Sequence, residues 1–218
     1  LVFFNDLYVL NGAGEPNRLF ENTNTRLIDV TNDMNVGGRA STLGGAWLDI
    51  DNDGYLDLIT SNVGVPPDIF HNSASQGFTT VSTQAIDPAS RDRVRTMAGV
   101  AASDVDRDGD VDVFLGGILG ADALLVNSTD DIGNWIAIHL ESRKDMTPIG
   151  ASIQITTASG MQTRTITAAT LMGTQLGNNA HFGLSGDVSV QSTRIQWPSG
   201  QEQVFSDILP NQRLEISE

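Results

Sequence analysis

The chain has 218 residues, a formal net charge of −15 and a mean hydropathy of −0.11, with 39% hydrophobic residues. This composition is typical of a globular protein and leaves room for one large or two small cores. The acidic excess argues against nucleic acid and anionic membranes as partners, and the short basic cluster at 91–95 is predicted to be a solvated loop. There is no cysteine, which excludes disulfides and thiolate chemistry.

The sequence does not predict membrane insertion. Its most apolar stretch, residues 113–126, is too short for a membrane-spanning helix and is interrupted by glycines and Asp122. The first residue is not Met and no charged segment followed by an apolar one comes after it. We therefore expect a mature or excised segment of a protein.

In chain order, the first element is part of a repeat. Residues 5–22 match the second half of a unit found twice downstream, with Asp6 aligned with Asp57 and Asn22 aligned with Asn72. The acidic loop of the later units has no counterpart in this first copy. The predicted division is a half unit at 1–35 and complete units at about 36–90 and 91–131.

Residues 49–57, DIDNDGYLD, form the first acidic loop. Two carboxylates roughly 4 Å apart repel by about 4 kcal/mol at an effective dielectric of about 20, so several in one turn require a cation. Gly54 permits the sharp turn, and a set of hard oxygen ligands suits calcium better than zinc or copper. The predicted ligands are the side chains of Asp49, Asp51, Asp53 and Asp57 and the carbonyl of Tyr55.

Residues 104–112, DVDRDGDVD, repeat this loop, and the flanking sequences match as well. The spacer residues Asn52 and Arg107 are predicted to point outward. Unlike an EF-hand, each loop closes with Asp three positions after Gly and lies between predicted strands, so we expect two structural calcium sites. The predicted ligands of the second site are the side chains of Asp104, Asp106, Asp108 and Asp112 and the carbonyl of Asp110.

The hydrophobic pattern predicts an all-β protein. In each unit an apolar run ends at the first aspartate and an alternating run leaves the loop, which indicates a strand, loop, strand hairpin; residues 78–83 are predicted as the next strand. From about residue 132 longer alternating runs appear, such as 134–140. We predict partial β-propeller-type repeats with calcium-binding loops over 1–131, and a β-sandwich or barrel-like domain over 132–218.

Both parts resemble known families. GGAWLDIDNDGYLDLITSN and GVAASDVDRDGDVDVFLGG resemble FG-GAP/VCBS repeats, the calcium-binding blades of integrin-like β-propellers. The segments NWIAIHL, IGASIQI, HFGL and WPSG occur in the order found in the ASPIC/UnbV domain, which often follows such repeats. Within HFGL and WPSG we expect Phe182 and Trp197 to be buried and Gly183 and Gly200 to lie in turns.

No catalytic pattern is found. His71, His139 and His181 are far apart in sequence, and there is no nucleophile elbow, phosphate loop or zinc-protease motif. We therefore expect no enzyme activity. The predicted function is that of a secreted or cell-surface calcium-binding module for adhesion or assembly.

The expected partners are other protein chains or further copies of this one. Open sheet edges favour such pairing, with residues 6–11 completing a neighbour's sheet in an oligomer or filament. The alternative is a carbohydrate-binding accessory module of a secreted polysaccharide-active system, in which Trp47, Trp135 and Trp197 stack on sugars. In the competing interpretation Trp47 packs between repeat units and Trp197 anchors a strand end.

Overall fold

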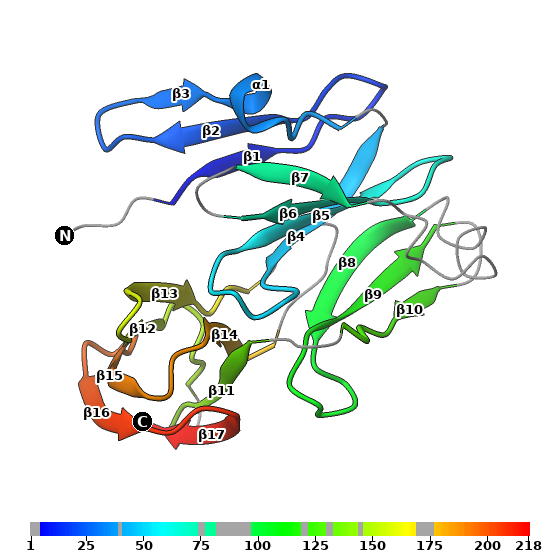
Figure 1. Cartoon of the computed structure of the whole chain (residues 1–218). Helices are drawn as coiled ribbons and strands as arrows, with labels where there is room; N and C mark the ends of the chain where they lie inside the picture. Colours follow the sequence, from blue (N-terminus) through cyan, green and yellow to red (C-terminus); the bar gives the residue numbers. More distant parts are fainter. Residues whose placement is uncertain are drawn as a thin grey trace.

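The computed structural model describes residues 5–38, 41–73, 77–81, 97–118, 122–129, 133–143, 146–168 and 177–218. Within these residues the chain forms seventeen strands in five sheets and one short helix, so the all-β prediction is confirmed. Figure 1 shows three sheets from the first part of the chain and, beside them, a separate body made from β11 to β17. No helix among the described residues is long and apolar enough to cross a membrane.

The first three sheets are antiparallel, and the strands of each follow the order of the chain. The short helix α1 (Thr31–Met34) follows the first sheet. The first sheet consists of β1 (Leu7–Val9), β2 (Arg18–Asn22) and β3 (Leu27–Asp29); the second of β4 (Thr42–Leu48), β5 (Asp57–Asn62), β6 (Asp68–Asn72) and β7 (Phe78–Val81); the third of β8 (Met97–Ser103), β9 (Asp112–Gly117) and β10 (Ala123–Leu125).

Alternation along the strands places apolar side chains between neighbouring sheets. Leu19 of the first sheet packs in one cluster with Leu58 and Phe70 of the second. A further cluster joins the second and third sheets. The Trp47 ring lies 6.0 Å from the rings of Tyr8 and Phe78, so this residue packs between the first two sheets, as the sequence predicts. The members of the cluster between the second and third sheets include Ala46, Ile59, Val100 and Leu115.

The C-terminal body is a sandwich of two sheets. One has the order β14-β11-β17, with β11 and β17 parallel, and the other the order β13-β12-β15-β16. Neither sheet closes into a barrel within the described residues. The strands are β11 (Asn134–Glu141), β12 (Ser152–Thr156), β13 (Met161–Thr165), β14 (Asn179–Ser185), β15 (Val190–Gln196), β16 (Glu202–Ile208) and β17 (Gln212–Ser217).

Two of the predicted motifs, HFGL and WPSG, contribute residues to the core of the sandwich. Phe182 and Trp197 are buried, and the indole Nε1 of Trp197 donates a hydrogen bond to Gln203, so their structural interpretation is confirmed. Gly200 lies in a turn with φ +92°, also as predicted. The prediction for Gly183 is wrong, because this glycine lies inside strand β14. The reason is its close packing against the first acidic loop, described below.

Residues 7–9 of the predicted pairing segment 6–11 form β1, and β1 pairs with β2 of its own sheet. Its pairing with another chain remains a prediction. The basic cluster at 91–95, residues 82–83 of the strand predicted at 78–83, and the boundary between 131 and 132 lie outside the described residues.

Candidate metal centre

Each acidic loop closes a hairpin, as the sequence predicts. The first connects β4 to β5 and the second connects β8 to β9. Both loops lie at the end of their sheets nearest to the C-terminal sandwich (Figure 1). The two loops are also joined to each other, because the side-chain amide of Asn52 donates a hydrogen bond of 3.0 Å to the carbonyl of Gly109.

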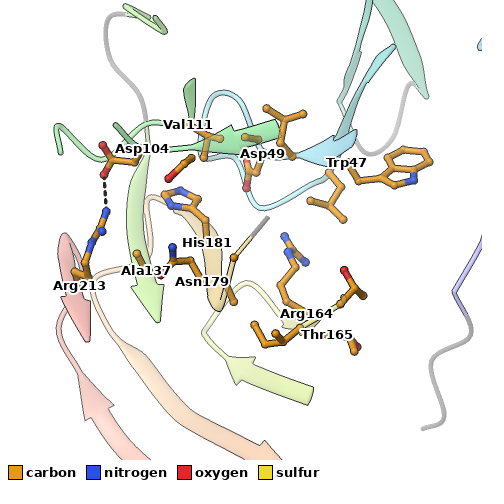
Figure 2. Close-up of a pocket in the computed structure, with 18 residues that line it drawn as sticks. Trp47, Asp49, Asp104, Val111, Ala137, Arg164, Thr165, Asn179, His181 and Arg213 are labelled. Atoms are coloured by element: carbon orange, nitrogen blue, oxygen red, sulfur yellow. Dashed lines mark hydrogen bonds and ion pairs between the residues drawn. The ribbon is translucent and has the colours of Figure 1, made fainter. Parts of the chain in front are cut away.

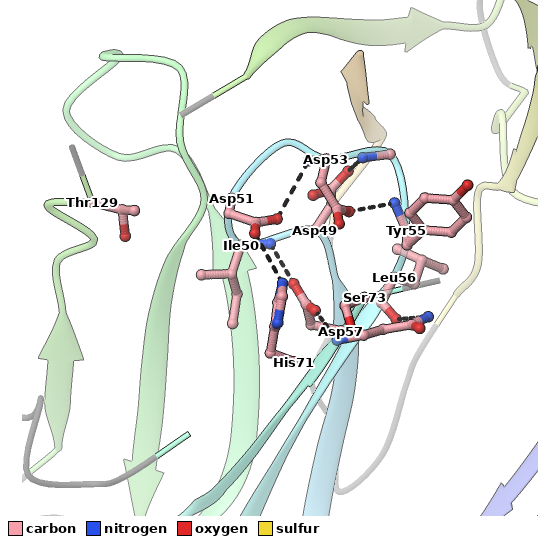
Figure 3. Close-up of polar contacts among 12 residues, drawn as sticks. Asp49, Ile50, Asp51, Asp53, Tyr55, Leu56, Asp57, His71, Ser73 and Thr129 are labelled. Atoms are coloured by element: carbon pink, nitrogen blue, oxygen red, sulfur yellow. Dashed lines mark hydrogen bonds and ion pairs between the residues drawn. The ribbon is translucent and has the colours of Figure 1, made fainter. Parts of the chain in front are cut away.

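The first loop gathers its carboxylates around one point. One oxygen each from Asp49, Asp51 and Asp57 lie within 4.8 Å of one another, and so do ligand atoms of Asp51, Asp53 and His71. Figure 3 shows these side chains converging from the loop, with His71 approaching from β6. The structure therefore brings together the four aspartates that the sequence predicts.

Hydrogen bonds within the first loop leave one buried oxygen without a donor. The amide of Gly54 donates to Asp49 Oδ2 at 2.9 Å, whereas Asp49 Oδ1 is buried and has no partner. Burial raises the pKa of Asp49 to about 7 and that of Asp57 to about 6. Desolvation penalises the ionised form of Asp49, and the charge of the nearby Arg164 only partly offsets this penalty.

The second loop forms two overlapping clusters in the same way. Oxygens of Asp104, Asp106 and Asp108 lie within 4.8 Å of one another, and so do oxygens of Asp106, Asp110 and Asp112. Asp110 Oδ1 is buried without a hydrogen-bond partner, and burial together with the neighbouring carboxylates raises the pKa of Asp110 to about 7. The sequence assigns Asp110 through its carbonyl, but its side chain belongs to the cluster.

The closing aspartate has the same environment in both loops. Asp57 accepts hydrogen bonds from the amides of Ile50, at 2.8 Å, and Asn72, at 2.7 Å. Asp112 accepts corresponding bonds of 2.8 Å from Val105 and Asn127. These bonds fold the second residue of each loop back onto the closing aspartate, which holds the loop in a tight turn.

The first sheet has one of the two hydrogen bonds found at the closing aspartates. Asp6 accepts a hydrogen bond of 2.8 Å from the amide of Asn22, the residue aligned with Asn72 and Asn127. The same bond therefore occurs in three successive sheets. This supports the alignment of Asp6 with Asp57 and of Asn22 with Asn72 that the sequence predicts.

The spacer residues of the two loops differ. Both have positive φ, +58° at Asn52 and +68° at Arg107, which is the left-handed region that Asn tolerates well. Arg107 is exposed as predicted. The outward orientation predicted for Asn52 is wrong: its exposed fraction is 0%, because the C-terminal sandwich covers the first loop.

The contact between the first loop and the sandwich is close. The amide of Ser185 donates to the Asn52 carbonyl at 2.7 Å, and the amide of Gly133 donates to the Asp51 carbonyl at 3.1 Å. A Cβ at Gly183 would overlap Asp49 Oδ2 and the Asn52 backbone. Glycine at 183 is thus required by the approach of another part of the chain, not by a turn.

A small cavity of about 130 Å³ lies at this junction. Figure 2 shows His181 and Arg164 of the sandwich projecting into it toward Asp49, and an ion pair between Arg213 and Asp104 at its side. Burial and the neighbouring Arg164 and Arg213 cations lower the pKa of His181 to about 4, so this imidazole is neutral at pH 7.

Sequence reasoning missed His71 as a candidate ligand. Its Nε2 lies 2.9 Å from Asp51 Oδ2. The signal available in the sequence was its position immediately before Asn72, the residue that the repeat places beside the closing aspartate. The side chain of Tyr55 is exposed, and its amide donates to Asp53 at 2.8 Å; ligation by its carbonyl remains a prediction.

Comparison with known proteins finds one family similar to the C-terminal part of the chain. The family model described as ASPIC and UnbV matches residues 141–218, from the last residue of β11 to the end of the chain. This region is therefore similar to the ASPIC/UnbV domain and contains three of the four motifs that indicate it, IGASIQI, HFGL and WPSG, whereas NWIAIHL at 134–140 precedes the match. No curated protein matches the chain.

Proposed function

We propose that this chain is a calcium-binding structural module, in which each acidic loop holds one calcium ion. The observation that carries the proposal is the pair of buried carboxylate oxygens without a hydrogen-bond donor, Asp49 Oδ1 and Asp110 Oδ1, each among further carboxylates. Such oxygens are stable in the ionised form only if a cation neutralises them.

The donor set favours calcium over other metals. The second loop offers only carboxylate and backbone oxygens, and the first adds a single imidazole from His71. Calcium accepts about six to eight oxygens at roughly 2.3–2.6 Å and tolerates irregular geometry. Zinc and copper would favour sites with more nitrogen or sulfur ligands. Asp49, Asp51, Asp53 and Asp57 would hold the first ion, and Asp104, Asp106, Asp108, Asp110 and Asp112 the second.

We interpret the three repeat sheets as propeller-type blades of the FG-GAP/VCBS kind. The recurrence of one aspartate to asparagine hydrogen bond in three successive sheets supports this interpretation. So does the position of each acidic loop between the first two strands of its sheet. In this arrangement the ions fasten loops that would otherwise be separated by charge repulsion.

The module would act in adhesion or assembly outside the cell or at its surface, without catalysis. Apolar side chains exposed on the outer sheets support a contact role, since Leu7 and Leu27 of the first sheet are about half exposed, as are Phe114 and Leu124 of the third. The expected partner is another protein chain or a second copy of this one. Light scattering in calcium tests self-association, and a monodisperse monomer would count against it.

Among the described residues, no contact specifically favours the carbohydrate-binding alternative. The Trp47 ring packs between Tyr8 and Phe78, Trp197 is buried, and the Trp135 ring stacks on His181 with centroids 5.9 Å apart. Each of the three tryptophans proposed for sugar stacking is thus engaged within the protein. A glycan array would test this alternative directly.

Calorimetric titration of the metal-free protein tests the calcium proposal, with magnesium as the matched ion. We expect two calcium ions per chain and weaker magnesium binding, because magnesium requires near-octahedral geometry. With a dissociation constant near 10⁻⁵ M and about 1 mM calcium, each site adds roughly 2.7 kcal/mol of stability. If the protein takes up no calcium and its thermal unfolding is unchanged by chelator, the proposal is wrong.

A further inference from the structure

Asn52 stands between two aspartates of the first loop and uses its polar groups to hold other parts of the chain. Its Nδ2 donates to the Gly109 carbonyl at 3.0 Å, and its Oδ1 lies 2.6 Å from Nε2 of His181. Because the amide nitrogen is already committed to Gly109, Oδ1 is the acceptor and His181 donates. The Asn52 carbonyl accepts a third bond, from the amide of Ser185.

These bonds connect three separate elements at one buried residue. Gly109 belongs to the second acidic loop, whereas His181 and Ser185 belong to strand β14 of the C-terminal sandwich. The Trp135 ring from β11 stacks on His181, and a Cβ at Gly109 would overlap its indole. Asn52, in the middle of the first loop, is therefore packed against both the sandwich and the second loop.

The second loop lacks this support at the equivalent position. Arg107 has nearly the same φ as Asn52, but it is exposed, and its amide donates a hydrogen bond within its own loop, to Asp104 at 2.6 Å. The difference is specific to the residue that separates the central aspartates of each loop. Neither Asn52 nor Arg107 is a member of the clusters of potential metal ligands.

We propose that Asn52 is a positioning residue through which the C-terminal sandwich sets the calcium affinity of the first loop. The inference rests on the proposed calcium function. Asn52 fixes the left-handed turn that orients Asp51 and Asp53, so docking of the sandwich organises both ligands before the ion binds. By thermodynamic reciprocity, calcium in the first loop strengthens docking of the sandwich by the same factor.

The test compares Asn52→Gly with Arg107→Gly. Glycine accepts the positive φ at both positions, so both variants loosen a left-handed turn, but only Asn52→Gly removes contacts with the sandwich and the second loop. The first loop is titrated calorimetrically in a background carrying Asp106→Asn and Asp108→Asn. The second loop is titrated in a background carrying Asp51→Asn and Asp53→Asn.

We expect Asn52→Gly to weaken calcium binding at the first loop about tenfold, within the usual range of coupling between sites. Arg107→Gly should change binding at the second loop less than threefold. Equal effects of the two substitutions would overturn the inference and leave the calcium function intact. Absence of calcium binding in the parent protein would overturn both.

A second pair of variants leaves the loop sequence unchanged. His181→Phe removes the donor to Asn52 but keeps a ring against Trp135, and His139→Phe is its control on neighbouring strand β11, where His139 bonds Asn179 near the surface. His181→Phe should weaken the first site, and His139→Phe should not. Circular dichroism in saturating calcium verifies that each variant is folded. If folded His181→Phe binds as tightly as the parent, the sandwich does not act through this bond.

Discussion

The two acidic loops share one sequence pattern but have different surroundings. In the first loop the spacer Asn52 is buried beneath the C-terminal sandwich, whereas in the second loop Arg107 and its neighbours Asp106 and Asp108 are exposed. Yet the closing aspartate of each loop accepts the same two backbone hydrogen bonds. The repeat thus specifies the local turn, and the rest of the chain determines how strongly each turn is held.

The largest loss of stability is expected when the glycine in the turn of either acidic loop is replaced. Gly54 and Gly109 have similar φ, +96° and +101°, but a Cβ at Gly109 would overlap the Trp135 ring, whereas a Cβ at Gly54 would meet the end of Gln162 at 3.2 Å. A side chain at positive φ costs about 1–3 kcal/mol. Overpacking a rigid neighbour adds about 1–3 kcal/mol. Urea unfolding should therefore show Gly109→Ala to be the more destabilising.

Gly186→Ala is the control for the added methyl group alone, because a Cβ at Gly186 meets nothing within 4 Å and Gly186 is not among the glycines with positive φ. We expect it to leave the free energy of unfolding nearly unchanged. Equal losses for Gly54→Ala and Gly109→Ala would show that Trp135 does not hold the second loop in the way its position indicates.

The next largest loss of stability is expected when one predicted calcium ligand is removed from either loop. In about 1 mM calcium, Asp51→Ala and Asp106→Ala should each lose the roughly 2.7 kcal/mol that one bound ion contributes, in addition to the effect of the substitution in chelator. In chelator, Asp106→Ala should be neutral or slightly stabilising, because it relieves repulsion among exposed carboxylates. Asp51→Ala should remain destabilising there, since it also removes the bond to His71. Thermal unfolding with and without calcium measures both, with Asp33→Ala on α1 as a control for the lost charge.

The stability of the metal-free protein should fall as the pH rises. Asp49, Asp57 and Asp110 have pKa values raised to between about 6 and 7, so the folded state retains protons that the unfolded chain releases above its ordinary pKa of about 3.8. Their stabilising contribution is complete below that value and is lost as the pH rises through the folded pKa. His181 acts in the opposite direction, because its folded pKa is lowered to about 4.

Since three groups oppose one, the melting temperature in chelator should be higher at pH 5 than at pH 7.5, by about 5 °C or more. In excess calcium the order should reverse, because the ion stabilises the ionised carboxylates. A melting temperature in chelator that rises between pH 5 and pH 7.5 would show that these aspartates are ionised in the metal-free fold.

The smallest expected effect is a change in tryptophan fluorescence where the second loop meets the C-terminal sandwich. The Trp135 ring lies between Gly109 of the second loop and His181 of the sandwich. Calcium should shift its fluorescence modestly, and Trp135→Phe should abolish that shift while Trp47 and Trp197 continue to emit. A calcium-dependent shift that persists in Trp135→Phe would place the change elsewhere in the fold.

The sequence by itself was sufficient for the features that depend on neighbours along the chain. The alternation of apolar residues predicted strands on both sides of each acidic loop, and β4, β5, β8 and β9 lie there. The spacing of the aspartates placed their side chains on one turn. In the structure those aspartates belong to four clusters of potential metal ligands, because a short turn restricts where their side chains can lie. The alignment of Asp6 with Asp57 also has a matching hydrogen bond.

Only the tertiary structure decided which residues face another part of the chain. Asn52 and Arg107 occupy the same repeat position, and no local rule distinguishes the buried one from the exposed one. Gly183 is required by the loop that packs on β14, far away in sequence, and His71 reaches Asp51 only because β6 pairs with β5. Local pattern fixes the path of the backbone, but burial depends on which surface docks against it, and that is a property of the assembled fold.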